Sequence, residues 1–370
     1  MMFEVLAKRA FLLLAFLFSG GISLTAQSVD FKILQPFDRV YYNSNIPTVE
    51  VMARAGRYFN SHGELECTIN SGDSVLYRFS QYFMAAMGDS AKLSFSFNLS
   101  PGFYRVDLKS EGRHIGGCVI GYEPEMIETD AEIPDDGGSF GQYWSEKIEE
   151  LSTYPKLASE KKIKELSKGS RDIYKVSINS YGGRSIECYY SVPRQKGRYK
   201  AVVRLVNLSD SLTFEKLGRQ LASDTLSDRI ILAAQVGESI DVVRLIDFLQ
   251  EKEEVLLGNI FAEGCGKAAA RAMIASAIDK RIAAVALFAP VSEYADLDTP
   301  LYGNLYVAAE NIDKPVLFGV DMDGAIADPS ENFALYNRLK CEKSYYIFPD
   351  KERLLLWDSL KRNFFDKNTR

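Results

Sequence analysis

Residues 254–288, EVLLGNIFAEGCGKAAARAMIASAIDKRIAAVALF, contain the pattern that decides the fold. Residues 254–261 and 281–288 are nearly continuous apolar runs of strand length, and residues 267–278 between them have the length and spacing of a helix. Strands that are apolar on both sides need cover on both faces, which is typical of parallel sheets flanked by helices. The stretch therefore predicts a strand, a helix and a second, parallel strand of an α/β protein.

The same alternation continues on both sides of this stretch. Three extended runs come first, over residues 172–178, 185–192 and 200–206. The remaining predicted helices cover residues 214–222, 240–250, 329–339 and 352–364, and the remaining predicted strands cover residues 229–236, 315–320 and 344–348. Leading antiparallel strands followed by this alternation fit the α/β-hydrolase architecture, although a generic doubly wound sheet would give a similar pattern.

The first third of the chain is predicted to form a separate β-sandwich. Residues 29–121 contain short strand-like runs, and residues 94–99 alternate polar and apolar side chains with a period of two. Several such strands in a short segment are typical of a small immunoglobulin-like sandwich. We expect three parts: the sandwich at residues 27–121, a linker with a helix at 122–150, and the α/β-hydrolase-like domain at 151–370.

The first 26 residues have the features of a secretory signal peptide. Lys8 and Arg9 precede a solid apolar run over residues 10–18, and small and polar residues follow up to Ala26. The apolar run is short for a bilayer core of about 30 Å, so we expect cleavage after Ala26. The mature chain is then predicted to be secreted or periplasmic, with no membrane span.

The charge balance and the histidine count limit the function. The chain of 370 residues has a formal net charge of −6, which argues against nucleic acid as a partner because phosphate binding needs clustered Lys and Arg. The two histidines, His62 and His114, both lie in the first third. A mechanism that needs a histidine base in the last two thirds is excluded unless the N-terminal domain reaches into the site.

The cysteines give no sign of a metal or redox site. Five of them are widely spaced and form no C-x-x-C pair, so we expect neither a metal nor another cofactor. Cys67 and Cys118 are candidates for a disulfide because both lie in the N-terminal region. The alternative is that all five cysteines are small buried hydrophobic residues.

Several short stretches of the chain follow one another in the order seen in a known family. They are residues 120–125, Trp144, residues 174–184, residues 192–193 and residues 199–204. Over roughly residues 120–365 the chain resembles the acetyl xylan esterase and cephalosporin-C deacetylase family, carbohydrate esterase family seven, in the form with an N-terminal sandwich. The resemblance implies an α/β-hydrolase fold and a Ser-Asp-His triad that removes acetyl groups from sugars or related esters.

In that family the nucleophile is the serine of a G-x-S-x-G turn between a strand and a helix. The resemblance places this turn at residues 264–268, Gly-Cys-Gly-Lys-Ala, and puts Gly266 at the position of the serine. Cys265 would serve only if the turn slipped by one residue, which would put Lys267 at a crowded position reserved for glycine. We therefore expect that the nucleophile is lost, and we interpret Cys265 as a small buried residue.

The other two triad positions are also changed. The acid is expected after the strand at 315–320, where the resemblance points to Gly324 with Asp323 beside it. The histidine is expected further on, where the chain has Arg353 or, with a short deletion, Lys351. Neither of these side chains exchanges a proton at neutral pH as an imidazole does.

Further parts of the family's site are missing as well. The glycine-rich loop that helps to form the oxyanion hole is replaced by residues 207–210, Asn-Leu-Ser-Asp. The segments between residues 236 and 240 and between residues 290 and 302, where the family builds substrate walls and subunit contacts, are short. Because triad members act as a unit, these changes together predict that esterase chemistry is lost.

The sequence therefore predicts a pseudo-esterase that binds a glycan or an envelope protein. Two alternatives stay open. One is a hydrolase that uses Cys265, or a serine elsewhere in the chain, as its nucleophile, with Asp323 and Lys351 in support. The other is a structural or assembly component of the cell envelope, because a fold does not fix a function.

Overall fold

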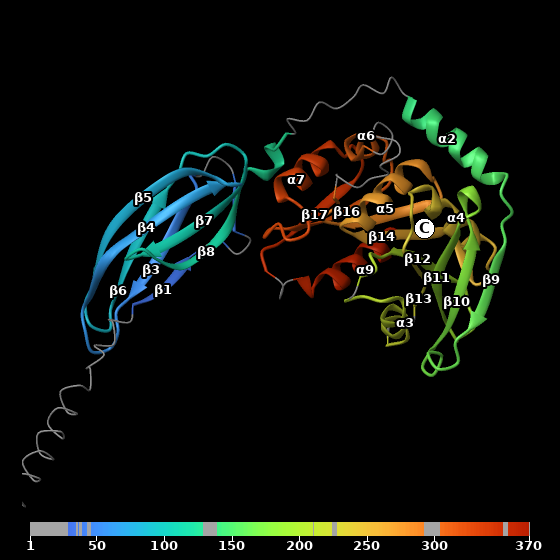
Figure 1. Cartoon of the computed structure of the whole chain (residues 1–370), viewed down its shortest axis with the longest axis horizontal. Helices are drawn as coiled ribbons and strands as arrows, with labels where there is room; N and C mark the ends of the chain where they lie inside the picture. Colours follow the sequence, from blue (N-terminus) through green and yellow to red (C-terminus); the bar gives the residue numbers. More distant parts are fainter. Residues whose placement is uncertain are drawn as a thin grey trace, which may run out of the picture. The chain divides into compact units, whose positions relative to one another are not determined.

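The computed structural model describes residues 29–369 with gaps at 35, 37–38, 43–45, 129–138, 210, 224–227, 292–303 and 351–353 (Figure 1). The expected signal peptide lies outside these described residues. The chain forms two compact units. The first holds the described residues before Gln35 with Ile46–Asn98 and Arg105–Cys118, and the second holds Pro36–Asn45, Leu99–Tyr104 and Val119–Arg370. The domain boundaries expected from the sequence stay a prediction.

The β-rich N-terminal region contains two sheets. One has the strand order β1-β3-β6, with β1 Asp30–Leu34, β3 Thr48–Arg54 and β6 Ser90–Ser96. The other has the order β2-β8-β7-β4-β5, with β2 Val40–Tyr41, β8 Arg113–Tyr122, β7 Gly102–Ser110, β4 Ser61–Ser71 and β5 Ser74–Ala85. Alternate residues of β3 are buried, because successive side chains of a strand point to opposite faces. The β-rich region expected before the α/β part is therefore present.

The second unit contains a nine-stranded sheet in the order β17-β16-β15-β14-β12-β13-β11-β10-β9 (Figure 1). Strands β9 Ala158–Lys162, β10 Arg171–Asn179 and β11 Ser185–Pro193 are antiparallel to their neighbours. The parallel strands are β12 Tyr199–Leu205, β13 Arg229–Ala234, β14 Val255–Cys265, β15 Ile282–Phe288, β16 Val316–Asp321 and β17 Lys343–Phe348. The mostly parallel sheet confirms the α/β class expected from the sequence.

Helices cover both faces of this sheet (Figure 1). They are α2 Ser139–Ser152, α3 Phe214–Ser223, α4 Ile240–Gln250, α5 Lys267–Ile278, α6 Leu305–Glu310, α7 Pro329–Arg338 and α9 Trp357–Lys367. Helices α4, α5, α6 and α7 pack into one core, whereas Trp357 and Phe365 of α9 pack into another. Every residue of β13 and β15 is buried, which explains why these strands read as unbroken apolar runs.

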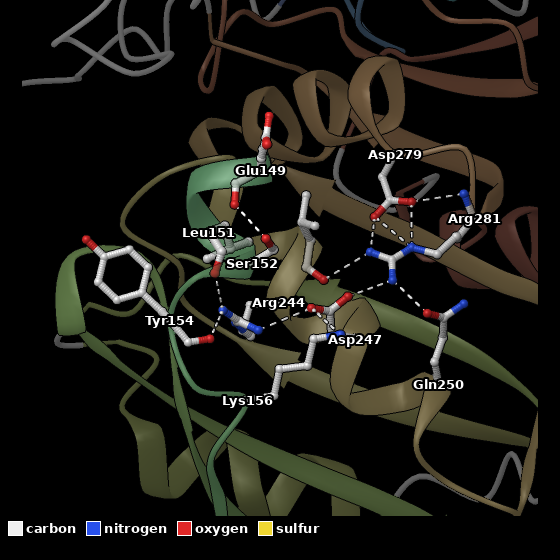
Figure 2. A network of polar contacts seen from close by, with 11 residues as sticks. Glu149, Leu151, Ser152, Tyr154, Lys156, Arg244, Asp247, Gln250, Asp279 and Arg281 are labelled. Atoms are coloured by element: carbon white, nitrogen blue, oxygen red, sulfur yellow. Dashed lines mark hydrogen bonds and ion pairs between the residues drawn. The ribbon is translucent and has the colours of Figure 1, made fainter. Parts of the chain in front are cut away.

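A network of charged side chains joins α2, α4 and the end of α5 (Figure 2). Arg244 of α4 is 1% exposed, and its Nη2 donates to the carbonyl oxygens of Leu151 at 2.7 Å and Tyr154 at 3.1 Å. Asp247 Oδ1 accepts from Arg281 Nη1 at 2.6 Å, and Asp247 Oδ2 accepts from Arg244 Nη1 at 3.3 Å. Asp247 therefore holds two guanidinium groups together and fixes α4 against the connection that follows α5.

Candidate functional site

The turn between β14 and α5 consists of one residue, Gly266. Strand β14 extends to Cys265, four residues beyond the predicted end at residue 261, and α5 begins at Lys267. Gly266 has φ 59° and ψ −123°, a conformation that side chains with a Cβ rarely adopt. The sequence-predicted turn at residues 264–268 is therefore a sharp strand-to-helix turn at the carboxyl end of a central strand.

The two glycines of this turn are required for different reasons. A Cβ at Gly264 would lie 2.6 Å from the carbonyl carbon and oxygen of Ala268, so only glycine lets the strand pass this close to the helix. A Cβ at Gly266 would lie 3.3 Å from Ile326 Cγ2 and 3.6 Å from Asn207 Nδ2. A side chain at position 266 would thus point toward the ends of β12 and β16, where a nucleophile would meet its substrate.

In the loop after β12, two polar groups donate hydrogen bonds to other groups of the protein. The side chain of Asn207 donates from Nδ2 to the carbonyl oxygen of Cys265 at 2.8 Å. The backbone N–H of Leu208 donates to Gln235 Oε1 at 2.7 Å. An oxyanion hole needs N–H groups that point at the reacting oxygen and have no other acceptor. The N–H of Leu208 does not meet this requirement.

Cys265 is exposed, so its interpretation as a small buried cysteine is wrong. The reason is its position at the last residue of β14, where the strand leaves the sheet. The surrounding protein still removes water from the sulfur, and this desolvation raises the pKa of the thiol to about 11, with Lys361 opposing the rise and Asp321 adding to it. The thiol is therefore protonated at neutral pH, which makes it a weak nucleophile.

None of the five described cysteines forms a disulfide. All five are free thiols, so the structure does not contain the expected Cys67–Cys118 disulfide. Cys67 and Cys188 are buried, whereas Cys118 and Cys341 are half-buried. Burial, with smaller contributions from Cys118 and Asp107, raises the pKa of the Cys67 thiol to about 12. Burial also raises the pKa of the Cys188 and Cys341 thiols. These three thiols are protonated at neutral pH.

Of the predicted acid and base positions, the structure describes Asp323 and Gly324. Asp323 is exposed in the turn after β16, and it has no hydrogen bond or ion pair with another described residue. Gly324 beside it has φ 68°, and its N–H donates to the carbonyl oxygen of Asp321. Lys351 and Arg353 lie outside the described residues. The roles of all four positions stay predictions.

A cavity of about 350 Å³ lies beside the turn. It opens at the carboxyl ends of β12, β14 and β15, which is where ligands bind in open α/β sheets. Its apolar wall is formed by Phe288, Ile326, Leu354 and Trp357, and its polar wall by Arg204, Glu263 and Lys361. The residues just before α9 continue this apolar surface, because Leu355 and Leu356 are exposed as well.

The polar wall is a buried charge cluster that the sequence analysis did not identify. Glu263 of β14 is 5% exposed, accepts from Arg204 Nε and lies 3.0 Å from Lys361 Nζ. Lys361 Nζ also lies 2.9 Å from Asp358 Oδ1. Burial alone would raise the pKa of Glu263, but Arg204 and Lys361 lower it to about 2. The signal that could have found this cluster is the presence of Arg204 and Glu263 inside two apolar strands.

The described residues contain no group of three or more His, Cys, Asp or Glu side chains with the arrangement of a metal site. In the same part of the chain, none of the helices combines the length and apolarity needed to cross a membrane. The arrangement at the carboxyl edge is thus a sharp turn without a side chain at its tip, next to a cavity with an apolar wall and a neutralised charge cluster.

Comparison with protein families and curated proteins points to one group of esterases. Residues 293–367 match the family described as acetyl xylan esterase (AXE1). Acetyl esterase Axe7A of Xylanibacter ruminicola is 25% identical over 103 residues, which are 28% of this chain and 23% of that protein. The chain therefore spans about a quarter of the length of the curated relative that it matches.

Solved structures show the same fold for the second unit. The acetyl xylan esterase from Paenibacillus sp. R4 has a TM-score of 0.58 at 16% identity, and the match covers 67% of this chain and 99% of that one. Acetyl xylan esterase 1 from Thermoanaerobacterium sp. JW/SL YS485 has a TM-score of 0.55 at 17% identity, and the match covers 67% of this chain and 98% of that one. At such identities the likeness concerns the fold, which hosts many functions.

Proposed function

We propose that the chain is a divergent relative of the acetyl xylan esterases and acts as a secreted pseudo-esterase, which binds a glycan or protein partner without hydrolysing an ester. The observation that carries this proposal is Gly266, which stands at the tip of the nucleophile turn and has no side chain. In serine hydrolases, removing the nucleophile alone lowers kcat by about 10⁶-fold, because the triad acts as a unit.

Two further observations support the loss of acyl transfer. The N–H of Leu208 is already donated to Gln235, so a tetrahedral oxyanion would lack this donor. The sequence from residue 115 to residue 370 contains no histidine that could act as a general base. Nucleophile, base and oxyanion donor are thus all replaced in the second unit.

The cavity supports the binding role. Its volume of about 350 Å³ is in the range of small-ligand sites. Exposed leucines at 354–356 continue its apolar wall, and exposed apolar surface of this kind marks an interaction site. Trp357 lies in the wall, so its fluorescence reports on occupancy when acetylated xylo-oligosaccharides are added. A Trp357→Phe variant is the control that removes this signal.

An esterase assay on the purified protein tests the proposal. We expect no turnover of acetylated xylan or of a small aryl acetate above the buffer rate, and no change in a Cys265→Ala variant. Clear turnover that disappears in Cys265→Ala would overturn the proposal. Turnover that survives in Cys265→Ala and is lost in Gly266→Val would overturn it too, since it would place another nucleophile beside the turn.

The second candidate function is a hydrolase that uses Cys265. The observation in its favour is that this thiol is exposed and lines the cavity next to the turn. A pKa of about 11 weakens it, because only a small fraction of the thiol is ionised at neutral pH. Labelling of Cys265 by an aryl acetate, detected as an acetyl adduct by mass spectrometry, would favour this candidate.

A further inference from the structure

Strand β5, Ser74–Ala85, is a long edge strand. It is the last strand of its sheet, and among the described strands it pairs only with β4. An edge strand presents a row of backbone N–H and C=O groups, which proteins usually protect by short length, charges or proline. The edge strand β9 is protected in this way, since it has five residues and three charges. In contrast, β5 has twelve residues, no proline and a single charge, Arg78.

The outer face of β5 is also apolar. Side chains alternate along a strand, and the residues on this face are Arg78, Ser80, Tyr82 and Met84, whereas Leu76 lies at a register shift of the β4–β5 pair. Leu76, Tyr82 and Met84 are 46%, 65% and 71% exposed. The opposite face is occupied, because Tyr77 and Phe79 contact Phe97. An apolar strip therefore runs along an unprotected sheet edge.

The charges beside this strip form no ion pair within the described part of the chain. Arg78 has no ion pair with another described residue. On β4, Glu64 lies directly opposite Tyr82 and Glu66 directly opposite Ser80, and neither carboxylate has an ion pair with a described residue. The surface thus offers one cation on β5 and two anions on the neighbouring strand β4. A partner that carries the same groups in the reverse order would be complementary, and a second copy of this chain is such a partner.

We propose that β5 pairs antiparallel with β5 of a second copy, about a twofold axis at Ser80. In this register Ser80 faces Ser80 of the second copy, and Arg78 faces its Tyr82. A shift of one residue would set outer-face side chains against inner-face ones. A register centred on Arg78 would set two guanidinium groups against each other, which destabilises a strand pair.

The chosen register also satisfies the charges. A guanidinium group above the face of a tyrosine ring is attracted by the ring electrons. In the second copy, Glu64 lies on the strand next to Tyr82. The backbones at Arg78 and at this Glu64 are therefore two strand spacings apart, about 9.6 Å. The two long side chains can span this distance. The twofold axis forms each of these contacts twice, and the backbone groups of both edges are paired at the same time.

Sedimentation velocity of the purified protein over a range of concentrations tests the pairing. We expect a concentration-dependent dimer, whose Kd rises roughly tenfold or more in a Ser80→Lys variant because two like charges meet at the axis. Ser94→Lys makes the same change at an exposed position of β6 and should leave the Kd unchanged. A monomer at every soluble concentration, or equal effects of both variants, would overturn the proposal.

Cross-linking tests the register itself. Directly opposite side chains of antiparallel strands have Cβ atoms about 4.5–5.5 Å apart, close to the separation in a disulfide. In a Cys265→Ala background, which removes the exposed thiol, Ser80→Cys should give a covalent dimer on oxidation, whereas Ser94→Cys should not. Cross-linking by Ser94→Cys alone would overturn the register. A chain that stays monomeric and binds a strand of another protein on β5 would overturn the pairing of two copies.

Discussion

Gly266 fits the unusual backbone conformation of the turn. A residue with a Cβ at φ 59° and ψ −123° carries strain of about 1–3 kcal/mol. A hydrolase with a G-x-S-x-G turn accepts this strain because the turn presents its nucleophile above the sheet. A glycine avoids the strain and leaves the backbone in place. Under the proposed pseudo-esterase function, no nucleophile is needed at this position and nothing would offset the strain of a side chain.

We predict that Gly266→Ser does not create an esterase. The new hydroxyl would point toward Asn207 and Ile326, but no histidine follows residue 114 and the N–H of Leu208 is already engaged. The variant should also lose about 1–2 kcal/mol in the free energy of unfolding. Intact-mass analysis after treatment with a fluorophosphonate probe checks the first point, and urea unfolding checks the second.

Gly182→Ser is the matched control for this variant. Gly182 has φ 66° and ψ 17° and open space around its Cβ position, so a side chain there also meets a positive φ, but in the left-handed region that residues with a Cβ tolerate better. We expect a smaller loss of stability than for Gly266→Ser and no labelling. A covalent adduct on Gly266→Ser alone would show that a base and an oxyanion site exist beside the turn, and the proposed loss of chemistry would then be wrong.

Cys265 gives a pH-dependent prediction. Its thiol has a pKa of about 11, so the thiolate fraction and the rate of alkylation by iodoacetamide should rise about tenfold per pH unit from pH 7 to pH 10. A small free thiol, with a pKa of about 8.5, should level off within this range. Peptide mapping isolates the signal of Cys265 from the half-buried cysteines. A rate that is already constant at pH 8 would contradict the raised pKa and favour the cysteine hydrolase.

At the residue scale, the sequence locates part of the site. The glycines of residues 264–268 mark the turn, because strand, turn and helix follow directly along the chain. The Arg204–Glu263–Lys361 cluster is different. Arg204 and Glu263 meet because β12 and β14 are neighbours, and Lys361 reaches them from α9. Such a contact depends on strand order, which the pattern of apolar residues does not contain.

At the scale of elements, Asp247 links Arg244, which contacts the end of α2, to Arg281 after α5 (Figure 2). We predict that Asp247→Asn lowers the free energy of unfolding by about 3 kcal/mol, because it leaves the buried Arg244 without its only carboxylate in the network. Urea unfolding followed by circular dichroism measures this loss. Glu310→Gln is the control, since Glu310 pairs with Arg338 and Lys340 near the surface and should contribute less than about 1 kcal/mol. Equal effects would contradict a structural role for the network.

The pattern of the sequence predicts buried elements better than exposed ones. The strands and helices of the second unit are found because burial on both faces leaves unbroken apolar runs, as in β15. Strand β14 runs further than predicted, since the polar Glu263 within it is buried with its partners. Helix α9 begins at Trp357 rather than residue 352. Strand β5 does not alternate, because it has apolar residues on both faces, and so it lacks the signal of a half-buried strand.

At the scale of the whole molecule, the fold and the site carry separate information. Gly266 and the Arg204–Glu263–Lys361 cluster belong to neither of the two cores on the faces of the sheet, so a chain can keep its packing while these residues change. This separation is why the sequence predicts the α/β class and why a shared fold with esterases leaves the activity open. The edge residues themselves, Gly266 and the charge cluster, decide what the molecule does there.

The charge cluster also sets how the molecule responds to acid. Glu263 has a pKa of about 2 in the folded protein, below the ordinary value of about 4.3, so its ionised form stabilises the fold above about pH 4.3. This contribution, about 3 kcal/mol, is lost as the pH falls through the folded pKa. The Glu263→Gln variant lacks this contribution at every pH. The difference in the free energy of unfolding between the original protein and the variant should therefore be largest at pH 7, and it should shrink by about 3 kcal/mol toward pH 2. Urea unfolding at a series of pH values measures it. A difference that is constant with pH would mean that Arg204 and Lys361 do not hold an ionised carboxylate, and the polar wall of the cavity would have to be assigned anew.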